Sequence, residues 1–187
     1  REAMSKPLSA LQAWASGNQQ PALAELCSEY AAHSQSGITR LLNGPTGERN
    51  SYAILPREHV LCLAEVESDL LTQLAAVLAV GSSAVLPQSE LAKALLARLP
   101  KEVQARITLV ADWTKDDVIF DAVLHHGDCD QLRDVCQQVA QRAGAIVGVQ
   151  GLSQGETNIA LERLVIERAL SVNTAAAGGN ASLMTIG

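Results

Sequence analysis

The chain has 187 residues, of which 48% are hydrophobic, 18% charged and 3% aromatic, and its formal net charge is −6. This length and hydrophobic content suit one globular α/β domain and exclude a disordered chain. The negative charge, with Lys and Arg scattered and no basic stripe, argues against a nucleic-acid-binding domain.

The cysteines and the apolar segments indicate the cellular compartment in which the protein is found. Four cysteines lie within or beside apolar segments and no Cys-x-x-Cys pair occurs, so we expect a reduced, cytoplasmic protein. The longest apolar run, Leu70 to Val80, is interrupted by polar residues and is too short to cross a bilayer. The chain begins with Arg1 inside a helical pattern and without a signal peptide, which suggests a piece of a longer polypeptide.

Residues 1–50 predict a helix and a connecting loop. From Pro21 to Ala32 apolar residues recur at helical spacing, and proline is tolerated in a first helical turn. Residues 34–50 are rich in Gly, Ser, Asn and Thr, include the string GPTGERN from Gly44 to Asn50, and predict an exposed loop.

Strands and helices are predicted to alternate over residues 51–151. Strands are expected at 52–55, 60–64, 84–86, 107–111, 122–124 and 145–149. Helices are expected at 69–80, 90–99 and 130–143, with a short one near 116. The expected N-caps are Ser68, Ser89 and either Asp128 or Asp130, and Gly81 is expected to end the first of these helices.

This alternation predicts the fold class. Strands joined by helices of about ten residues imply crossover connections and a mostly parallel sheet covered on both faces, so we expect a Rossmann-like α/β domain at 51–151. Residues 164–172 place Leu164, Ile166, Leu170 and Val172 on one face, as in a half-buried strand. We therefore expect a β-flap at 152–172, outside the main sheet.

Residues 173–187 form an unusual tail. The segment from Ser171 to Gly187 has no charged or aromatic side chain and many small residues. Solvated tails are usually charged or rich in Pro and Ser, whereas small residues let the backbone approach another surface closely. We interpret this extended tail as a docking peptide.

Two stretches resemble the long bifunctional proline utilization A flavoenzymes. They are ERALSVNTAAAGGNAS, from Glu167 to Ser182, and GPTGERN followed by YAILPREHVLCLAE, so the resemblance covers roughly the whole chain. That family joins an FAD-dependent proline dehydrogenase to an NAD-dependent L-glutamate γ-semialdehyde dehydrogenase, and its longest members append a C-terminal domain like this one. The resemblance implies an aldehyde dehydrogenase-like fold without activity, which helps to cover the cavity that carries the semialdehyde between two active sites.

The resemblance also implies cofactors and partners. FAD and NAD would belong to other parts of the longer protein, and this chain would hold no cofactor. Its partners would be the two dehydrogenase domains of the same polypeptide, in a dimeric cytoplasmic enzyme that can associate peripherally with the inner membrane. Some members carry an N-terminal DNA-binding domain that represses the proline operon, and none of that machinery lies in this sequence.

Three aldehyde dehydrogenase motifs are altered in this sequence. Leu86-Pro87 has leucine where the family has the lysine that holds the ribose of the cofactor. The turn from His126 to Asp130 replaces the Gly-rich turn that receives the pyrophosphate, and its two carboxylates would repel a phosphate. Gln150 stands where the family has the general-base glutamate, and an amide cannot accept that proton. We therefore expect no catalytic and no cofactor-binding residue.

The cysteines and histidines raise two further possibilities. The family's nucleophilic cysteine lies in a separate catalytic domain, for which this chain has no room, and Cys62 and Cys136 lie on apolar faces that suggest packing. The only cluster with metal-ligand chemistry is His125, His126, Asp128 and Cys129. Because adjacent residues on a strand point to opposite faces, we expect a capped loop there rather than a zinc site.

The functional prediction is a surface that docks between domains. Arg49, Arg57 and Arg163 are interpreted as solvated charges, whereas Arg168 lies on the apolar face of the flap strand and is expected to be paired or at an interface. The predicted docking and tunnel-lid residues are Arg168, Asn173, Thr174, Ala175, Ala176, Gly178, Gly179, Asn180 and Ser182.

The alternative function is a ligand-binding module. In that case a residual nucleotide or metabolite site would lie in the crevice beyond Leu86, Ala111 and Leu124, at the ends of three predicted strands.

Overall fold

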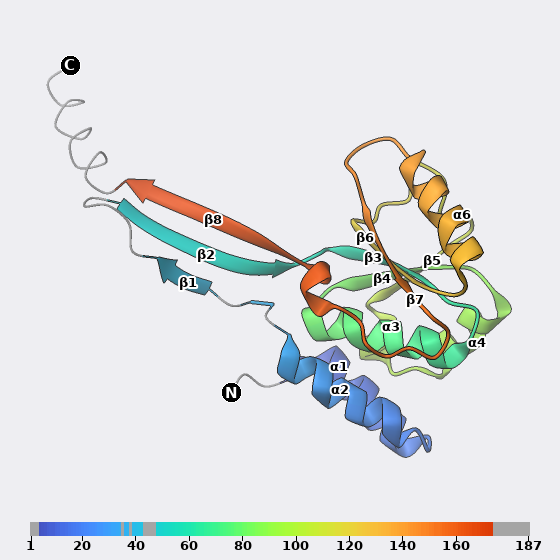
Figure 1. Ribbon diagram of the computed structural model, residues 1–187. Coiled ribbons are helices and arrows are strands. Elements are labelled where there is room, and N and C mark those ends of the chain that lie inside the picture. The colour runs from blue at the N-terminus through green and yellow to red at the C-terminus, as the bar shows by residue number, and fades with distance from the viewer. Residues whose placement is uncertain (1–3, 35, 38, 43–47, 174–187) are drawn as a thin grey trace, which may run out of the picture.

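A five-stranded parallel sheet forms the centre of the structure, a computed structural model that describes residues 4–34, 36–37, 39–42 and 48–173. The strand order is β5-β4-β3-β6-β7 (Figure 1). The strands are β3 (His59–Leu63), β4 (Ser83–Pro87), β5 (Ile107–Val110), β6 (Ala122–His126) and β7 (Gly148–Leu152). The predicted Rossmann-like α/β fold is therefore confirmed.

The chain changes direction within this sheet. From β3 it adds β4 and then β5 on one side, and it returns to add β6 and β7 on the other side of β3. Because β3 and β6 are neighbours, the reversal leaves a topological switch point at their carboxyl ends. Open α/β sheets bind ligands at such a point.

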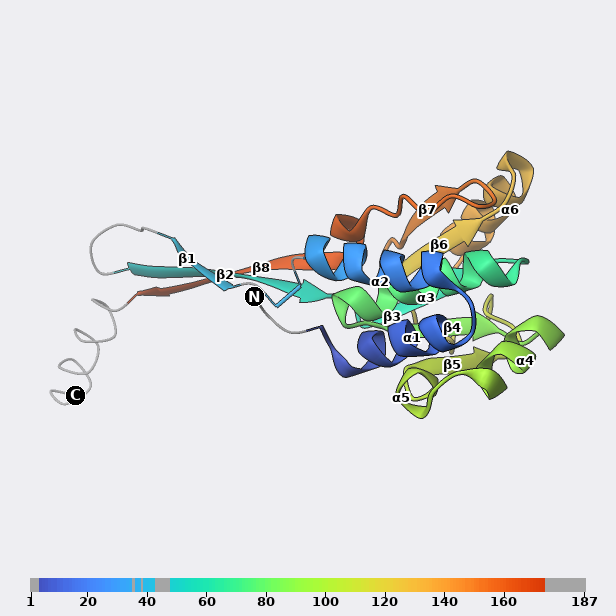
Figure 2. The same ribbon diagram turned by 90° about the horizontal axis from the view of Figure 1, so that it is seen from below.

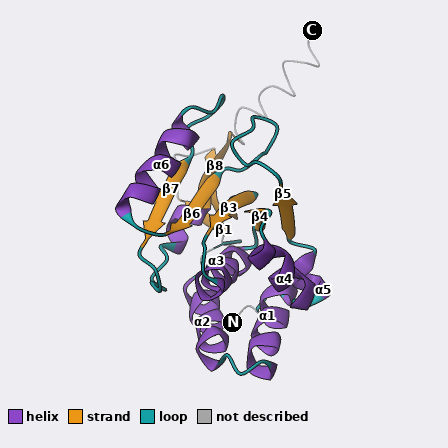
Figure 3. Cartoon of the chain, turned by 90° about the vertical axis from the view of Figure 1, so that its right-hand side faces the viewer, coloured by secondary structure: helices purple, strands orange, loops and turns teal. Residues whose placement is uncertain are grey.

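Helices cover both faces of the sheet, but unequally (Figure 3). Helix α3 (Glu67–Val80) lies on one face beneath α1 (Lys6–Gly17) and α2 (Pro21–His33), together with α4 (Glu90–Arg98) and α5 (Lys101–Gln104). Only α6 (Cys129–Ala140) lies on the opposite face in the described part of the chain. None of the described helices combines the length and apolarity needed to span a membrane.

Alternation along the strands creates two apolar layers. Val60 and Cys62 of β3 belong to the larger core beneath α3, whereas Leu61 and Leu63 belong to a smaller core on the α6 side. This period of two is what a sheet covered on both faces requires. Helix α3 is buried along most of its length because the sheet and α2 sandwich it, which explains the near-continuous apolar run from Leu70 to Val80.

Three of the four predicted helix boundary residues are confirmed. Ser89 accepts a hydrogen bond from the Ala92 amide at the start of α4, and Gly81 ends α3 in the left-handed region with φ 87°. Asp128 caps α6 in a reciprocal capping box with Gln131. The prediction for Ser68 is wrong, because α3 begins two residues earlier and Val66 is its N-cap.

A second, antiparallel sheet projects away from the first as a β-flap (Figures 1 and 2). Its order is β1-β2-β8, and β2 (Glu48–Pro56) pairs with β8 (Val165–Asn173) along its whole length, from Glu48 opposite Asn173 to Pro56 opposite Val165. Strand β1 (Thr39–Leu42) pairs with the other edge of β2. The predicted flap strand at 164–172 thus corresponds to β8.

The flap corrects two sequence predictions. Residues 52–55, expected to open the α/β alternation, belong to β2 of the flap, and the parallel sheet begins only at β3. The predicted loop at 34–50 contains β1 and the start of β2. The loop-forming composition of this segment led to the wrong prediction. Strands β1 and β2 form because antiparallel partner strands bond to their backbones, and the local sequence does not indicate those partners.

Smaller differences occur elsewhere in the described chain. The N-terminal region contains two helices, α1 and α2, where one was expected. No helix forms near Asp116, and α5 and a 3₁₀ turn at Leu161–Leu164 were not predicted. Strand β7 lies three residues later than the predicted start at 145, because residues 141–147 form turns and bends after α6.

Candidate functional site

The main candidate site is a pocket at the switch point of the parallel sheet. Its volume is about 380 Å³, and residues at the carboxyl ends of β3, β4 and β6 line it beside α3 and α6. The apolar lining includes Leu63, Leu70, Leu86, Trp113 and Val135. Of the three crevice residues expected from the sequence only Leu86 lines this pocket, since Leu124 is in the core and Ala111 is exposed elsewhere.

His125 lines the pocket without a hydrogen-bond partner. It is the fourth residue of β6, is 5% exposed, and its buried Nδ1 atom has no partner among the described residues. Burial lowers the pKa of the His125 imidazole below its ordinary value, and the neighbouring His126 acts in the same direction. A neutral imidazole offers one hydrogen-bond donor and one acceptor, so His125 is a free polar group in an apolar lining.

Gly127 provides the room for the His125 ring. A Cβ at this position would lie 2.7 Å from His125 Cε1 and would also meet the side-chain oxygen of Gln131. Gly127, in the turn that replaces the family's pyrophosphate-binding turn, is therefore needed for close packing between β6 and the start of α6.

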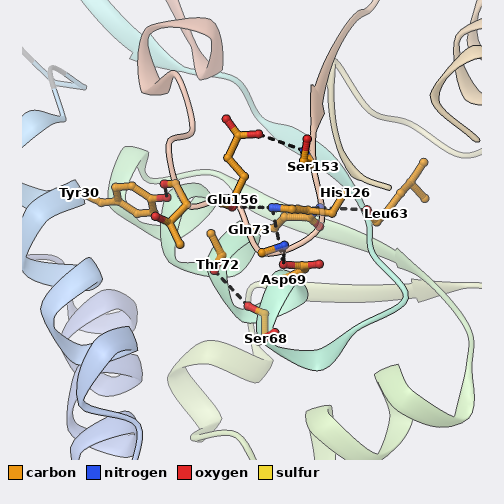
Figure 4. Close-up of polar contacts among 11 residues, drawn as sticks. Tyr30, Leu63, Ser68, Asp69, Thr72, Gln73, His126, Ser153 and Glu156 are labelled. Carbon is orange, nitrogen blue, oxygen red and sulfur yellow. Dashed lines mark hydrogen bonds and ion pairs between the residues drawn. The ribbon is translucent and has the colours of Figure 1, made fainter. Parts of the chain in front are cut away.

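His126, the next residue, is fully engaged in a buried polar network (Figure 4). Its Nδ1 atom lies 2.9 Å from Gln73 Nε2, and its Nε2 atom lies 2.8 Å from the Glu156 carbonyl oxygen. Since the Gln73 amide donates, Nδ1 accepts, and Nε2 carries the proton that it donates to Glu156. This ring ties β6 to α3 and to the segment after β7.

Asp69 and Gln73 complete the network from α3. The Asp69 carboxylate accepts a hydrogen bond of 2.9 Å from the Gly155 amide and lies 3.9 Å from His126 Nε2. Gln73 Nε2 also donates to the Leu63 carbonyl at 2.9 Å. Sequence analysis missed these residues because a polar residue inside an apolar helical run does not reveal its partner, although Gln73 within that run was the available signal.

The pocket lining carries negative but no positive side chains. Glu65 and Asp134 are exposed carboxylates of the lining, and neither Lys nor Arg is among the residues that surround the pocket in the described structure. Such a pocket disfavours an anionic ligand, since no cation compensates the charge.

The three altered aldehyde dehydrogenase positions have structural roles here. Pro87 lines the pocket beside Leu86 and ends β4. Asp128 occupies the N-terminus of α6, where its carboxylate accepts a hydrogen bond of 2.8 Å from the Gln131 amide. Gln150 is 6% exposed and bridges to the Ala160 backbone, accepting from its amide at 2.7 Å and donating to its carbonyl at 3.3 Å.

The cysteines and the possible metal ligands do not form a reactive centre in the described residues. Cys62 is fully buried, and burial raises the pKa of its thiol, as it raises that of Cys27 to about 12. Cys129 and Cys136 are exposed, so the expected packing role is wrong for Cys136. No three His, Cys, Asp or Glu side chains converge on a point that could hold a metal ion within the described ranges.

The flap presents the predicted docking residues that the structure describes. Arg168 is exposed on β8 opposite Ala53, Ile166 is 39% exposed, and no hydrogen bond or ion pair of Arg168 occurs among described residues. Of the expected half-buried face, Ile166 is exposed and Leu164, just before β8, is buried, whereas the side chains of Leu170 and Val172 lie outside the described part. Asn173 ends β8, whereas Thr174, Ala175, Ala176, Gly178, Gly179, Asn180 and Ser182 lie outside the described residues.

The other arginines differ from one another. Arg163 donates to the Val149 carbonyl at 3.2 Å, and Arg57 is half-buried with its Nε atom unpaired among described groups. The interpretation of both as solvated charges is too simple, because each packs where the flap joins the parallel sheet. The side chain of Arg49 lies outside the described part.

Comparisons with known proteins give sequence relatives over almost the whole chain. It is 56% identical over 187 residues to the bifunctional protein PutA of Escherichia coli (strain K12), and 59% identical over 181 residues to that of Salmonella typhimurium. The PutA of Rhizobium meliloti is 38% identical over 179 residues. These matches cover 93–100% of this chain but only 14% of each relative's length. No protein-family model matches the chain.

Solved structures show the same fold at lower identity. A proline utilization A variant of Bradyrhizobium japonicum aligns with a TM-score of 0.53 at 20% identity, over 70% of this chain and 15% of that one. Substrate-bound AldH of Staphylococcus aureus gives 0.56 at 13% identity over 78% of this chain and 40% of that chain, and an NADP-dependent Escherichia coli enzyme gives 0.54 at 15% over 79% and 35%. The parallel sheet is thus of the aldehyde dehydrogenase kind.

Proposed function

We infer that this chain, which matches bifunctional PutA proteins over nearly its whole length, is one domain of such a proline-catabolic protein. Its role is non-catalytic: it helps to cover the cavity that carries L-glutamate γ-semialdehyde, and it supports the aldehyde dehydrogenase domain. Proline oxidation with FAD and semialdehyde oxidation with NAD take place elsewhere in the longer protein.

The environment of Gln150 is the observation that carries this proposal. The side chain stands where the resemblance puts a general base, yet both ends of its amide are bonded to the Ala160 backbone. An amide in this position holds the segment after β7 against the sheet and has no basic lone pair for proton abstraction. Gln150 therefore stabilises the fold in place of acting as a general base.

The approach to α6 supports the absence of a dinucleotide. A phosphate at a helix N-terminus needs free amide groups, but Asp128 already accepts from the Gln131 amide there. Its carboxylate also places negative charge where the phosphate would lie. These features favour a fold that keeps the aldehyde dehydrogenase sheet without its cofactor.

The flap supports a role in contact with other domains. The three-stranded sheet projects from the body (Figure 2). On β8 of this sheet, Ile166 and Arg168 are exposed. An exposed strand with apolar and cationic side chains suits a protein surface as its partner. We propose that this partner is a dehydrogenase domain of the same polypeptide, in a dimeric, cytoplasmic protein that can associate peripherally with the inner membrane.

The experiment compares the intact longer protein with a variant that lacks residues 174–187. We expect slower semialdehyde oxidation and a longer lag in NADH formation from proline, because misplacement of about 1 Å at a reacting centre can cost roughly a hundredfold in rate. Proline dehydrogenation in the same sample is the internal control and should change little. Unchanged semialdehyde oxidation with no added lag would contradict the lid role.

A second arm tests catalysis by the chain itself. The 187-residue chain is incubated with L-glutamate γ-semialdehyde and NAD, beside the heat-inactivated chain and the longer protein. We expect NADH formation only from the longer protein. Turnover by the chain above the heat-inactivated control would refute the non-catalytic proposal.

One observation favours a second function, that of a ligand-binding module. The pocket at the switch point keeps about 380 Å³ of space and an unpartnered histidine. Its lining does not suit the nucleotide that this fold usually binds, so the class of ligand must be inferred from the pocket itself.

A further inference from the structure

The pocket has the size and surface of a small-molecule site. Its volume of about 380 Å³ lies in the lower part of the usual range of roughly 300–1,000 Å³. Leu63, Leu70, Leu86 and Val135 line it from β3, α3, β4 and α6, and Trp113 adds an aromatic side chain. A compact apolar body therefore fits this space, whereas a dinucleotide is too large.

His125 adds a polar imidazole ring to this apolar lining. The residue is only 5% exposed, and the Nδ1 atom of its ring has no hydrogen-bond partner within the described structure. His126 is turned to Gln73 and Glu156 and cannot serve, since both of its ring nitrogens are engaged. A buried polar group without a partner costs free energy unless a ligand or water satisfies it.

Two carboxylates determine the sign of the charge that the pocket attracts. Glu65 follows β3, and Asp134 lies on the second turn of α6. Neither forms an ion pair with a described residue, and no cation lines the pocket. The electrostatic potential in the pocket therefore favours a cation.

We propose that this pocket binds an organic ammonium ion, a compact apolar group carrying a protonated amine that donates a hydrogen bond to His125 and is attracted by Glu65 and Asp134. The inference goes beyond the proposed domain role and does not depend on it. It also reverses the charge preference of a dinucleotide site, because the lining would repel phosphates.

Three probes that share a phenyl ring and differ in charge test the proposal. They are 2-phenylethylamine, the neutral 2-phenylethanol and the anion phenylacetate, and binding is followed by saturation-transfer NMR. We expect the amine to bind with a dissociation constant on the order of 1 mM, the alcohol more weakly, and phenylacetate not at all. Added salt should weaken the amine alone.

Variants assign the binding to this pocket. Glu65→Gln and Asp134→Asn should each weaken the amine about threefold, because these charges are exposed. His125→Ala should weaken it about fivefold through the lost hydrogen bond. Asp130→Asn, on the same helix as Asp134 but outside the pocket, is the matched control and should bind like the parent.

Binding is measured on both the 187-residue chain and the longer protein. In each, the quantity compared is the dissociation constant of the parent and of the variant. Equal binding of the three probes would overturn the proposal, as would tighter binding of phenylacetate than of the amine. Amine binding that survives in the Glu65→Gln, Asp134→Asn and His125→Ala variants would overturn it as well, because the ligand would then lie elsewhere.

Discussion

Two adjacent histidines of β6 have opposite situations. His126 is held by Gln73 and by the Glu156 carbonyl, whereas His125 has no partner and faces an apolar pocket. The sequence places the two side chains on opposite faces of a strand, but only the structure shows which partners each face supplies. His126 therefore stabilises the fold, whereas the side chain of His125 is available to a ligand.

The lowered pKa of His125 predicts a pH dependence of stability. Its ordinary value is 6.5, and burial places the pKa in the folded state below that value. At a pH between these two values the unfolded chain binds more protons, so the free energy of unfolding falls as the pH falls below about 6.5 and is insensitive to His125 above it.

Replacing His125 with glutamine should therefore reduce the pH dependence of the free energy of unfolding. We expect a smaller decrease in the free energy of unfolding between about pH 7 and pH 5 than in the parent, measured by urea denaturation. The variant His33→Gln, at an exposed position, is the control and should keep the parent's slope. An identical slope for His125→Gln and the parent would show that the buried imidazole does not resist protonation.

At the scale of elements, α6 depends strongly on its N-terminus. It covers one face of the sheet alone in the described chain, and Val139 is its only buried residue there. A helix with so little burial gains relatively more of its stability from its cap. The capping box of Asp128 and Gln131 also fixes the turn that holds Gly127 beside His125.

Asp128→Ala should lower the free energy of unfolding by about 1 kcal/mol, the usual cost of removing such a cap. Chemical denaturation at pH 7 measures this change. Asp130→Ala keeps the capping box while removing a first-turn carboxylate, so it should cost only about 0.5 kcal/mol. Equal effects of both variants would indicate general electrostatics of the helix rather than capping.

For the whole molecule, the N-terminal helix pair is part of the main core. Leu23 and Leu26 of α2 lie beside Leu71 of α3, and the Tyr30 hydroxyl donates to the Thr157 carbonyl in the segment after β7. This pair thus closes one face of the Rossmann-like body, although it precedes the body in the sequence.

Removing residues 1–34 should uncover α3 and abolish cooperative unfolding. Each large apolar side chain that is exposed costs about 2 kcal/mol, and several would be exposed at once. Thermal unfolding by circular dichroism and binding of an apolar dye would report the change. Tyr30→Phe keeps the packing and loses only the hydroxyl contact, so it should unfold cooperatively with a loss of about 1 kcal/mol.

The sequence determined the local elements and the kind of sheet. Short, near-continuous apolar runs mark β3, β4 and β6, and helices with identifiable caps at Ser89 and Asp128 separate the strands, which is the pattern of a parallel sheet covered on both faces. The altered residues at Leu86, Asp128 and Gln150 could also be read directly, because each is a change of chemical type at a recognisable position.

Only the tertiary structure decided which distant segments meet. Strand β2 pairs with β8, although more than a hundred residues separate them in the sequence. The residue pattern of neither strand predicts which strand it pairs with. Gln73 and His126 are 53 residues apart, yet they share a hydrogen bond in the core. Local periodicity reports which face of an element is buried, whereas strand pairing, the switch-point pocket and the partners of buried polar groups arise from non-local packing.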